Sequence, residues 1–213
     1  MFILYSPSVK SMLEWFPYTC LAAGFIIIAI AVTRKLGPEW AWINRKIIHF
    51  SIVPAILMFY YGKIPVEVFG VSAFIFGVVQ LWPHLKRHEL SWYQIKHNYG
   101  EVFFSFSASA VVLLFPREYA TALLLAMAIS DGVTGVVRHY YFKKNGFNVK
   151  LKKHWTGSLA YLITAIAIGL YLLEGGVVGK LAWATTLMLA EYQPWVDDNL
   201  AVPLVGSLLF LLY

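Results

Sequence analysis

The residues best suited to chemistry lie between positions 128 and 158, where an aspartate inside an apolar run precedes a strongly basic stretch. An ionisable side chain is costly in hydrocarbon, so Asp131 is by default a candidate functional group. The basic stretch supplies six cations: Arg138, Lys143, Lys144, Lys150, Lys152 and Lys153. An acid followed by this many cations predicts a site that binds the phosphates of a nucleotide, through a divalent cation, at the face of a membrane.

A second acidic group lies near the end of the chain, within EYQPWVDDN. Adjacent carboxylates with a carboxamide suit Mg²⁺, which takes oxygen ligands and usually bridges to substrate phosphates. The alternative is a solvated turn in which Asp198 or Asn199 caps the following helix. The expected metal ligands are Asp131, Asp198, Asn199 and Asp197.

The basic stretch ends in KKHWTGS, where an apolar segment begins. Thr156 and Ser158 could cap this helix, and a helix N-terminus after a glycine readily binds an anion. For Lys143 and Lys144 we favour contact with anionic lipid instead. No GxxxxGK[ST] or GxGxxG sequence occurs, which excludes a P-loop and a dinucleotide fingerprint.

Two further groups of polar residues open apolar segments. Arg45 and His49 are four residues apart and so share one helical face, although flanking cations that snorkel to headgroups would have the same pattern. Glu101 follows Asn98-Tyr99-Gly100 and could instead complement a helix dipole. The catalytic candidates are Asp131, Asp198, His49 and Glu101. The nucleotide-binding candidates are Arg45, Lys152, Lys153, Thr156, Gly157, Ser158, Gly132 and Arg138.

The composition is that of an integral membrane protein. Of the 213 residues 60% are hydrophobic and 13% are charged, against about 25% charged in an ordinary soluble domain. The apolar runs approach the ~20 residues that a helix needs to cross a bilayer. No alternating pattern of about ten residues favours a barrel. The single cysteine, Cys20, excludes an internal disulfide.

These runs predict one integral membrane domain over 1–213, an all-α bundle of seven to eight spans. The last two segments are short and could be tilted, re-entrant or parts of one broken element. The expected apolar segments are 15–33, 46–62, 65–82, 99–115, 118–138, 157–173, 177–191 and 199–213.

The cations are distributed unevenly among the connections between these segments. Thirteen of the 17 Lys and Arg residues follow the first, third and fifth segments. The positive-inside rule therefore places these loops in the cytoplasm and the N-terminus outside, in a cell membrane or in endoplasmic reticulum. The net charge of +6 could suggest a nucleic-acid partner, but the position of the cations argues against one. The loop that contains the second acidic group falls on the same side and faces the basic loops.

Five stretches, RKIIH, NYGE, SDGVTGVV, KHWTGS and DDNLAVPL, occur in the order seen in a known family. On these residues, which cover about 42–213, the sequence resembles the polyprenol kinases. This family includes dolichol kinase, phytol kinase and the CTP-dependent diacylglycerol kinase, and is distantly related to phosphatidate cytidylyltransferases.

The resemblance implies an enzyme that moves the γ-phosphate of CTP, with Mg²⁺, onto the hydroxyl of a membrane lipid such as dolichol, polyprenol, phytol or geranylgeraniol. By matching position, Asp131 belongs to the nucleotide and metal motif and Lys153 to the nucleotide loop, while Asp198 and Asn199 form the acidic C-terminal motif. A dolichol-type kinase of this kind would supply lipid phosphate for glycosylation, and it could be a homodimer.

Two positions depart from the family pattern. Thr156 stands where the family usually has glutamate, and Arg138 stands where many members have glycine. Two alternative functions are a cytidylyltransferase that makes a CDP-activated lipid, and an ion-coupled transporter that uses the intramembrane acid. The Asp-Arg-x-Asp ending of the cytidylyltransferases is missing here. The residues do not determine which lipid is bound or whether CTP or ATP is the donor. They also do not determine whether a carboxylate or His49 acts on the lipid hydroxyl.

Overall fold

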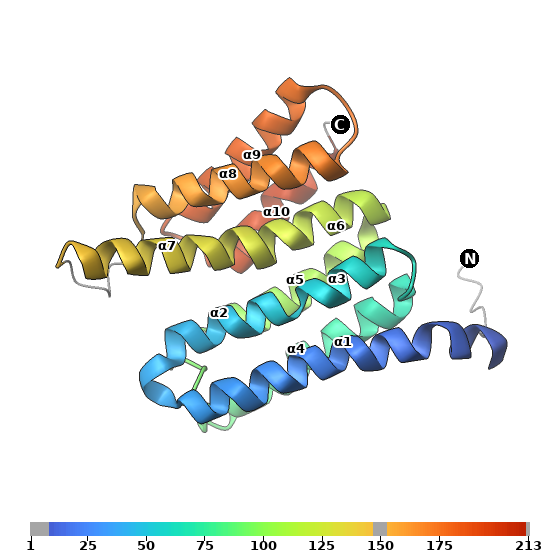
Figure 1. Cartoon of the computed structure of the whole chain (residues 1–213), viewed down its shortest axis with the longest axis horizontal. Helices are drawn as coiled ribbons and strands as arrows, with labels where there is room; N and C mark the ends of the chain where they lie inside the picture. The colour runs from blue at the N-terminus through green and yellow to red at the C-terminus, as the bar shows by residue number, and fades with distance from the viewer. Residues whose placement is uncertain (1–8, 147–152, 212–213) are drawn as a thin grey trace.

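The structure is a computed structural model that describes residues 9–146 and 153–211, and every regular element in these two ranges is helical. The prediction of an all-α chain is therefore confirmed for the described residues. Figure 1 shows most helices running along the long axis of the molecule. In chain order the elements are α1 (Val9–Leu36), η1 (Pro38–Trp40), α2 (Ala41–Ser51), α3 (Val53–Tyr60), α4 (Val66–Leu85), α5 (Gly100–Leu114), α6 (Arg117–Leu125), η2 (Ala126–Ser130), α7 (Asp131–Lys144), α8 (Trp155–Leu172), α9 (Val177–Tyr192) and α10 (Asp198–Phe210).

Each of the eight expected apolar segments corresponds to a helix or to consecutive helices, with two differences. The segment 46–62 is two helices, α2 and α3, that meet at Ile52. Pro54 lies in the first turn of α3, where its missing N–H cannot continue the hydrogen bonds of the preceding helix. The segment 118–138 is longer than expected, because α6, η2 and α7 follow one another without a break from Arg117 to Lys144.

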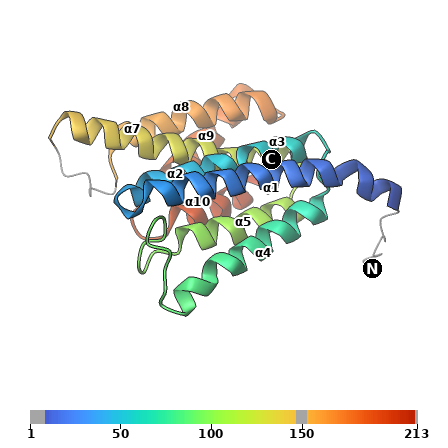
Figure 2. The ribbon, with the colours of Figure 1, turned by 60° about the horizontal axis from the view of Figure 1, so that its bottom comes forward.

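This continuous α6–η2–α7 rod occupies the middle of the molecule. Figure 1 shows α8 along one side of it and α2 with α3 along the other, and Figure 2 shows α10 and α5 beneath. Its interior positions include several alanines, among them Ala120, Ala126 and Ala128, which are fully buried. Small side chains of this kind let neighbouring helices approach closely in a membrane. The rod therefore fixes the positions of the helices around it.

Within the described residues, four helices are long and apolar enough to cross a membrane. They cover Leu13–Leu36, Val66–Leu85, Arg117–Lys144 and Trp155–Leu172. Of these, α1 and α4 present many large apolar side chains on the outer surface, such as Ile28 and Val79. Apolar surface on this scale is typical of helices that contact lipid.

The polar ends of several helices meet at one end of the molecule. In Figures 1 and 2 the connection from α1 to α2, the connection from α4 to α5, the end of α7 and the start of α8 all lie there. The predicted basic loops that the structure describes therefore lie at the same end of the molecule. The opposite end holds the α3–α4 and α8–α9 connections.

Tyr119 joins three helices inside this bundle. Its hydroxyl donates to the Gly206 carbonyl at 2.6 Å in α10 and accepts from Trp183 Nε1 at 3.2 Å in α9. Tyr119→Phe is expected to lower the free energy of unfolding by about 1–3 kcal/mol, because it leaves buried groups without their partner. The midpoint of thermal unfolding in detergent measures this loss. Tyr171→Phe, at an exposed position of α8, should leave the midpoint unchanged, and equal midpoints for both variants would refute the role of Tyr119.

Candidate active site

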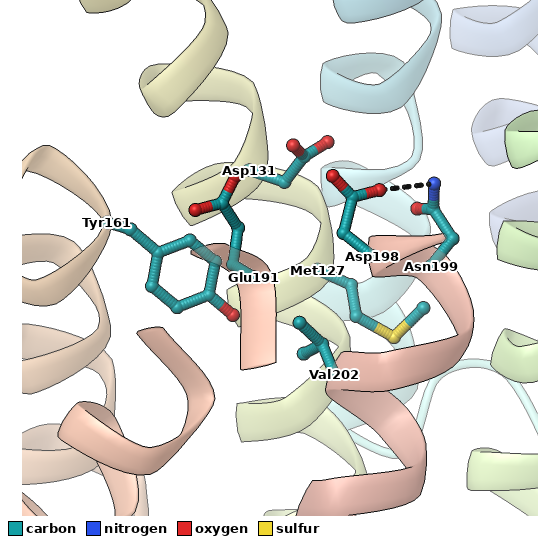
Figure 3. A pocket seen from close by; sticks show the side chains of 7 residues that line it. All are labelled: Met127, Asp131, Tyr161, Glu191, Asp198, Asn199 and Val202. Carbon is teal, nitrogen blue, oxygen red and sulfur yellow. Dashed lines mark hydrogen bonds between the residues drawn. The ribbon is translucent and has the colours of Figure 1, made fainter. Parts of the chain in front are cut away.

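Three carboxylates from different helices converge near the polar end of the bundle. One oxygen each from Asp131 in α7, Glu191 in α9 and Asp198 at the start of α10 lies within 4.8 Å of the others. Asp131 and Glu191 are buried and Asp198 is half-buried. Figure 3 shows the three acids at one end of a small cavity, with Met127 and Val202 toward its other end. The full lining is Met127, Asp131, Tyr161, Glu191, Asp198, Asn199 and Val202.

Two lysines neutralise much of this negative charge. Lys46 Nζ lies 2.7 Å from Asp131 Oδ2. Lys153 Nζ lies 3.0 Å from Glu191 Oε1 and 3.1 Å from Asp198 Oδ2, and it also donates to the Glu191 carbonyl. Burial acts to lower the pKa of Lys153, but the carboxylates of Asp198 and Glu191 outweigh it and raise the pKa overall. Lys153 is therefore a cation at neutral pH.

Local backbone structure positions each acid. Asp131 directly follows η2, a π-helical turn, and single π turns inside α-helices occur frequently at functional sites. Asp197 caps α10, because its Oδ1 accepts from Asn199 N at 3.0 Å and from Asn199 Nδ2 at 3.1 Å. The alternative that Asp198 or Asn199 is the cap is therefore wrong. With Asp197 occupied in this way, the Asp198 carboxylate is free to face Lys153.

Burial first, and then the adjacent Asp198 carboxylate, raise the pKa of Asp197. The hydrogen bonds from Asn199 act in the opposite direction and lower this pKa. The structure thus gives Asp197 a capping contact, while Asp198 meets Asp131 and Glu191. Asn199 Nδ2 donates to Asp198 Oδ1 at 3.2 Å and so helps to orient that carboxylate.

The three converging acids fit a divalent cation. Carboxylate oxygens are the hard ligands that Mg²⁺ selects, and here they come from three separate helices that the fold holds together. Glu191 Oε2 and the Tyr161 hydroxyl are buried at this site, and neither has a hydrogen-bond partner among the described residues. Buried polar atoms are normally satisfied. The missing hydrogen-bond partners of these two groups therefore favour a ligand at this position.

A second polar cluster surrounds Glu101, one of the predicted catalytic residues. Glu101 Oε1 lies 2.8 Å from His84 Nε2, and Glu101 Oε2 lies 3.7 Å from Arg45 Nη2. Arg45 also donates to Asn98 Oδ1 at 3.0 Å. Arg45 and Glu101 therefore belong together, in a cluster formed by α2, α4 and α5.

His49 connects the two clusters. Its Nδ1 lies 3.3 Å from Asp131 Oδ2, and its ring stacks on Phe104 with centroids 4.6 Å apart. His49 is also four residues from Arg45 on α2, as the spacing predicts. One face of α2 therefore spans both groups of predicted site residues.

Comparison with known proteins gives one informative match. The chain is 24% identical over 199 residues to phytol kinase of Synechocystis sp., an alignment that covers 87% of this chain and 85% of that protein. This similarity supports membership of the chain in the polyprenol and phytol kinase family. The predicted resemblance is thus confirmed. No protein-family model matches this chain, and no solved structure does.

The residues that match the nucleotide loop of the polyprenol kinases begin α8. A Cβ on Gly157 would lie 2.9 Å from Thr134 Cγ2, so the glycine permits contact between α7 and α8. The cap of α8 is His154, whose Nδ1 accepts from the Thr156 N–H at 3.4 Å, and the prediction that Thr156 or Ser158 caps it is wrong. Ser158 is buried on α8. Lys152 lies outside the described residues.

The remaining candidates lie on α7. Gly132 packs against Phe50, since a Cβ there would approach Phe50 Cζ to 2.5 Å. Arg138 lies seven residues, or about two helical turns, beyond Asp131 and beside Gly157, whose added Cβ would be 3.6 Å from Arg138 Cβ. Gly132 therefore has a packing contact, and Arg138 lies between the three-acid site and the polar end of the bundle.

Three residues of the site are missing from the sequence-based list: Lys46, Tyr161 and Glu191. A signal exists for two of them. Glu191 opens the acidic stretch EYQPWVDDN, and Lys46 stands between Arg45 and His49 in RKIIH. Tyr161 is one aromatic residue in an apolar segment, and no spacing distinguishes it.

Proposed function

We propose that this chain is a kinase that transfers the γ-phosphate of a nucleoside triphosphate to the hydroxyl of a membrane isoprenoid alcohol. Its similarity to a phytol kinase supports this class of acceptor. The observation that carries the proposal is the meeting of Asp131, Glu191 and Asp198 between Lys46 and Lys153. Acids that hold a divalent cation, next to cations that contact phosphate, are what phosphoryl transfer requires.

The donor in this proposal is CTP, as in the dolichol-type kinases that the motifs resemble, and the metal is Mg²⁺. Asp131, Glu191 and Asp198 would hold the ion, which neutralises charge on the phosphates when it is bound. Lys153 and Lys46 stabilise charge on the transferring group. The acceptor oxygen forms a bond to the γ-phosphorus, the bond from that phosphorus to the bridging oxygen breaks, and the nucleoside diphosphate leaves. His49 and Glu101 are the bases at hand for the hydroxyl proton.

We also propose seven to eight membrane spans, with the N-terminus outside and the site at the cytoplasmic interface. Four helices long enough to span, the shorter apolar helices α5 and α10, the α2–α3 pair and α9 together support this number. The gathering of basic connections at one end of the molecule supports the orientation by the positive-inside rule. The three-acid site lies toward that end, where water-borne nucleotide has access.

Product analysis tests the reaction. Purified protein is incubated with Mg²⁺, with CTP or ATP, and with a panel of dolichol, polyprenol, phytol, geranylgeraniol and diacylglycerol. We expect CDP and an isoprenoid monophosphate as products. Release of pyrophosphate with a CDP-lipid, when a lipid phosphate is supplied in place of the alcohol, would replace the kinase by a cytidylyltransferase. Solute flux across liposomes without nucleotide would replace it by a transporter.

Glu191→Gln tests whether the residue that the sequence-based list missed is a metal ligand. The substitution keeps the shape of the side chain but removes its charge. We expect the Mg²⁺ concentration for half-maximal activity to rise about 10- to 100-fold, as for other changes at metal sites. Glu174→Gln, at an exposed position between α8 and α9, serves as the control. An unchanged Mg²⁺ requirement in Glu191→Gln would remove Glu191 from the site.

A further inference from the structure

A second cavity is lined by His49, the residue that also lies beside Asp131 of the three-acid site. Its apolar wall includes Ile26 from α1, Ile52 at the junction of α2 and α3, and Phe76 from α4. Its polar wall includes His49 and Glu101. A cavity with one apolar wall and a few polar groups matches an amphipathic ligand.

The polar wall holds atoms that lack partners. His49 and Glu101 are 5% and 3% exposed, and neither His49 Nε2 nor Glu101 Oε2 has a hydrogen-bond partner among the described residues. The neighbouring Gln80 and Ser105 are bonded to each other at 3.1 Å. Buried polar atoms without partners destabilise a fold unless a ligand satisfies them, so His49 and Glu101 mark where a ligand donates or accepts.

The apolar wall leads toward the surface that contacts lipid. Ile26 and Phe76 are half-buried, and next to them Phe25, Ile28 and Ile75 are 44%, 63% and 56% exposed. These exposed residues belong to α1 and α4, two of the candidate membrane spans. A chain that leaves the cavity between Ile26 and Phe76 therefore continues into hydrocarbon.

We propose that this cavity binds the head of the acceptor, with its hydroxyl at His49 and Glu101 and its first apolar units against Ile26, Ile52 and Phe76. The inference rests on the proposed kinase function and assigns the acceptor a place within it. His49 Nδ1 lies 3.3 Å from Asp131 Oδ2, so His49 borders both this cavity and the three-acid site. The occupant is a neutral primary alcohol on a hydrocarbon chain.

The charge of the polar wall discriminates among lipids. Arg45 and His84 face Glu101, but Glu101 Oε2 has no hydrogen-bond donor among the described residues. This oxygen can accept a hydrogen bond from a hydroxyl, whereas a carboxylate repels an anionic phosphate. This cavity thus selects an alcohol and releases its phosphorylated product.

Two matched variants on α1 test the cavity. Ile26→Trp fills its apolar wall, whereas Ile28→Trp places the same side chain two residues away on the lipid-facing surface. We expect Ile26→Trp to raise the KM for geranylgeraniol roughly tenfold or more, as for a changed fit in an apolar pocket, with the KM for CTP unchanged. Ile28→Trp should match the wild type. If both variants have the same KM for geranylgeraniol, the acceptor binds elsewhere.

Photolabelling separates this inference from the proposed function, because it needs no turnover. A diazirine derivative of geranylgeraniol is irradiated with the wild-type protein, and labelled peptides are identified. We expect labelling at Ile26 and Phe76 that excess geranylgeraniol prevents, even if no alcohol is phosphorylated. Labelling confined to other helices would overturn the cavity assignment while leaving kinase activity intact. If Ile26→Trp does not fold, the labelled positions in wild-type protein decide alone.

Discussion

Asp131→Asn is expected to lower phosphorylation of an isoprenoid alcohol by about 10³-fold, since a metal at a phosphoryl-transfer site contributes several kcal/mol and each 1.4 kcal/mol is a factor of ten. Asp131 is the acid that lies beside residues from several helices of the site. It meets Glu191 and Asp198, pairs with Lys46 at 2.7 Å and lies beside His49. Asparagine has almost the same shape, so the loss reports the missing charge.

The measurement is initial rates with purified, folded protein at saturating CTP and Mg²⁺. Glu118→Gln is the matched control, because Glu118 is an exposed acid in the first turn of the same continuous rod. It should retain full activity. Near-wild-type turnover in Asp131→Asn would contradict the metal site.

The second large effect is an expected difference in activity between substitutions at two adjacent aspartates, Asp197 and Asp198. Asp198→Asn is expected to reduce activity about 10²- to 10³-fold, because it removes a carboxylate that faces Lys153 and the other two acids. Asp197→Asn should stay within a few-fold of wild type, because asparagine caps a helix about as well as aspartate. The ratio of the two initial rates is the measurement.

This pair decides between the structure and the sequence-based list, which names both aspartates as metal ligands. The structure uses Asp197 Oδ1 to bond Asn199 and start α10. Unfolding midpoints for both variants control for damage to the cap. Equal loss of activity in the two variants, with equal midpoints, would make Asp197 a ligand and contradict its capping role.

Much of the helical architecture follows from composition and run length. Apolar runs near the span of a bilayer predict helices, because the backbone must satisfy its own hydrogen bonds in hydrocarbon. The break at Ile52 is less predictable, because Pro54 can begin a helix or kink one. The π turn before Asp131 depends on packing around the rod, which one sequence does not reveal.

Only part of the site could be predicted from the sequence. Asp131 stands out because acids inside apolar runs are rare and costly. Glu191 lies at the end of a helix, where an acid has many ordinary explanations, and Lys46 resembles a cation that flanks a membrane span. Only the crossing of α2, α7, α9 and α10 brings these charges together. The lipid cavity is harder still, because its wall combines single isoleucines and phenylalanines from separate helices.

The position of the label from CTP tests the central claim most directly. Wild-type protein and Asp131→Asn are incubated with geranylgeraniol, Mg²⁺ and CTP that carries label at either the γ- or the α-phosphate. We expect the γ-label to appear in the lipid only with wild-type protein and Mg²⁺, and the α-label to stay in CDP. Transfer of the α-label to lipid, or transfer of the γ-label by Asp131→Asn at the wild-type rate, would contradict a kinase built on these three acids.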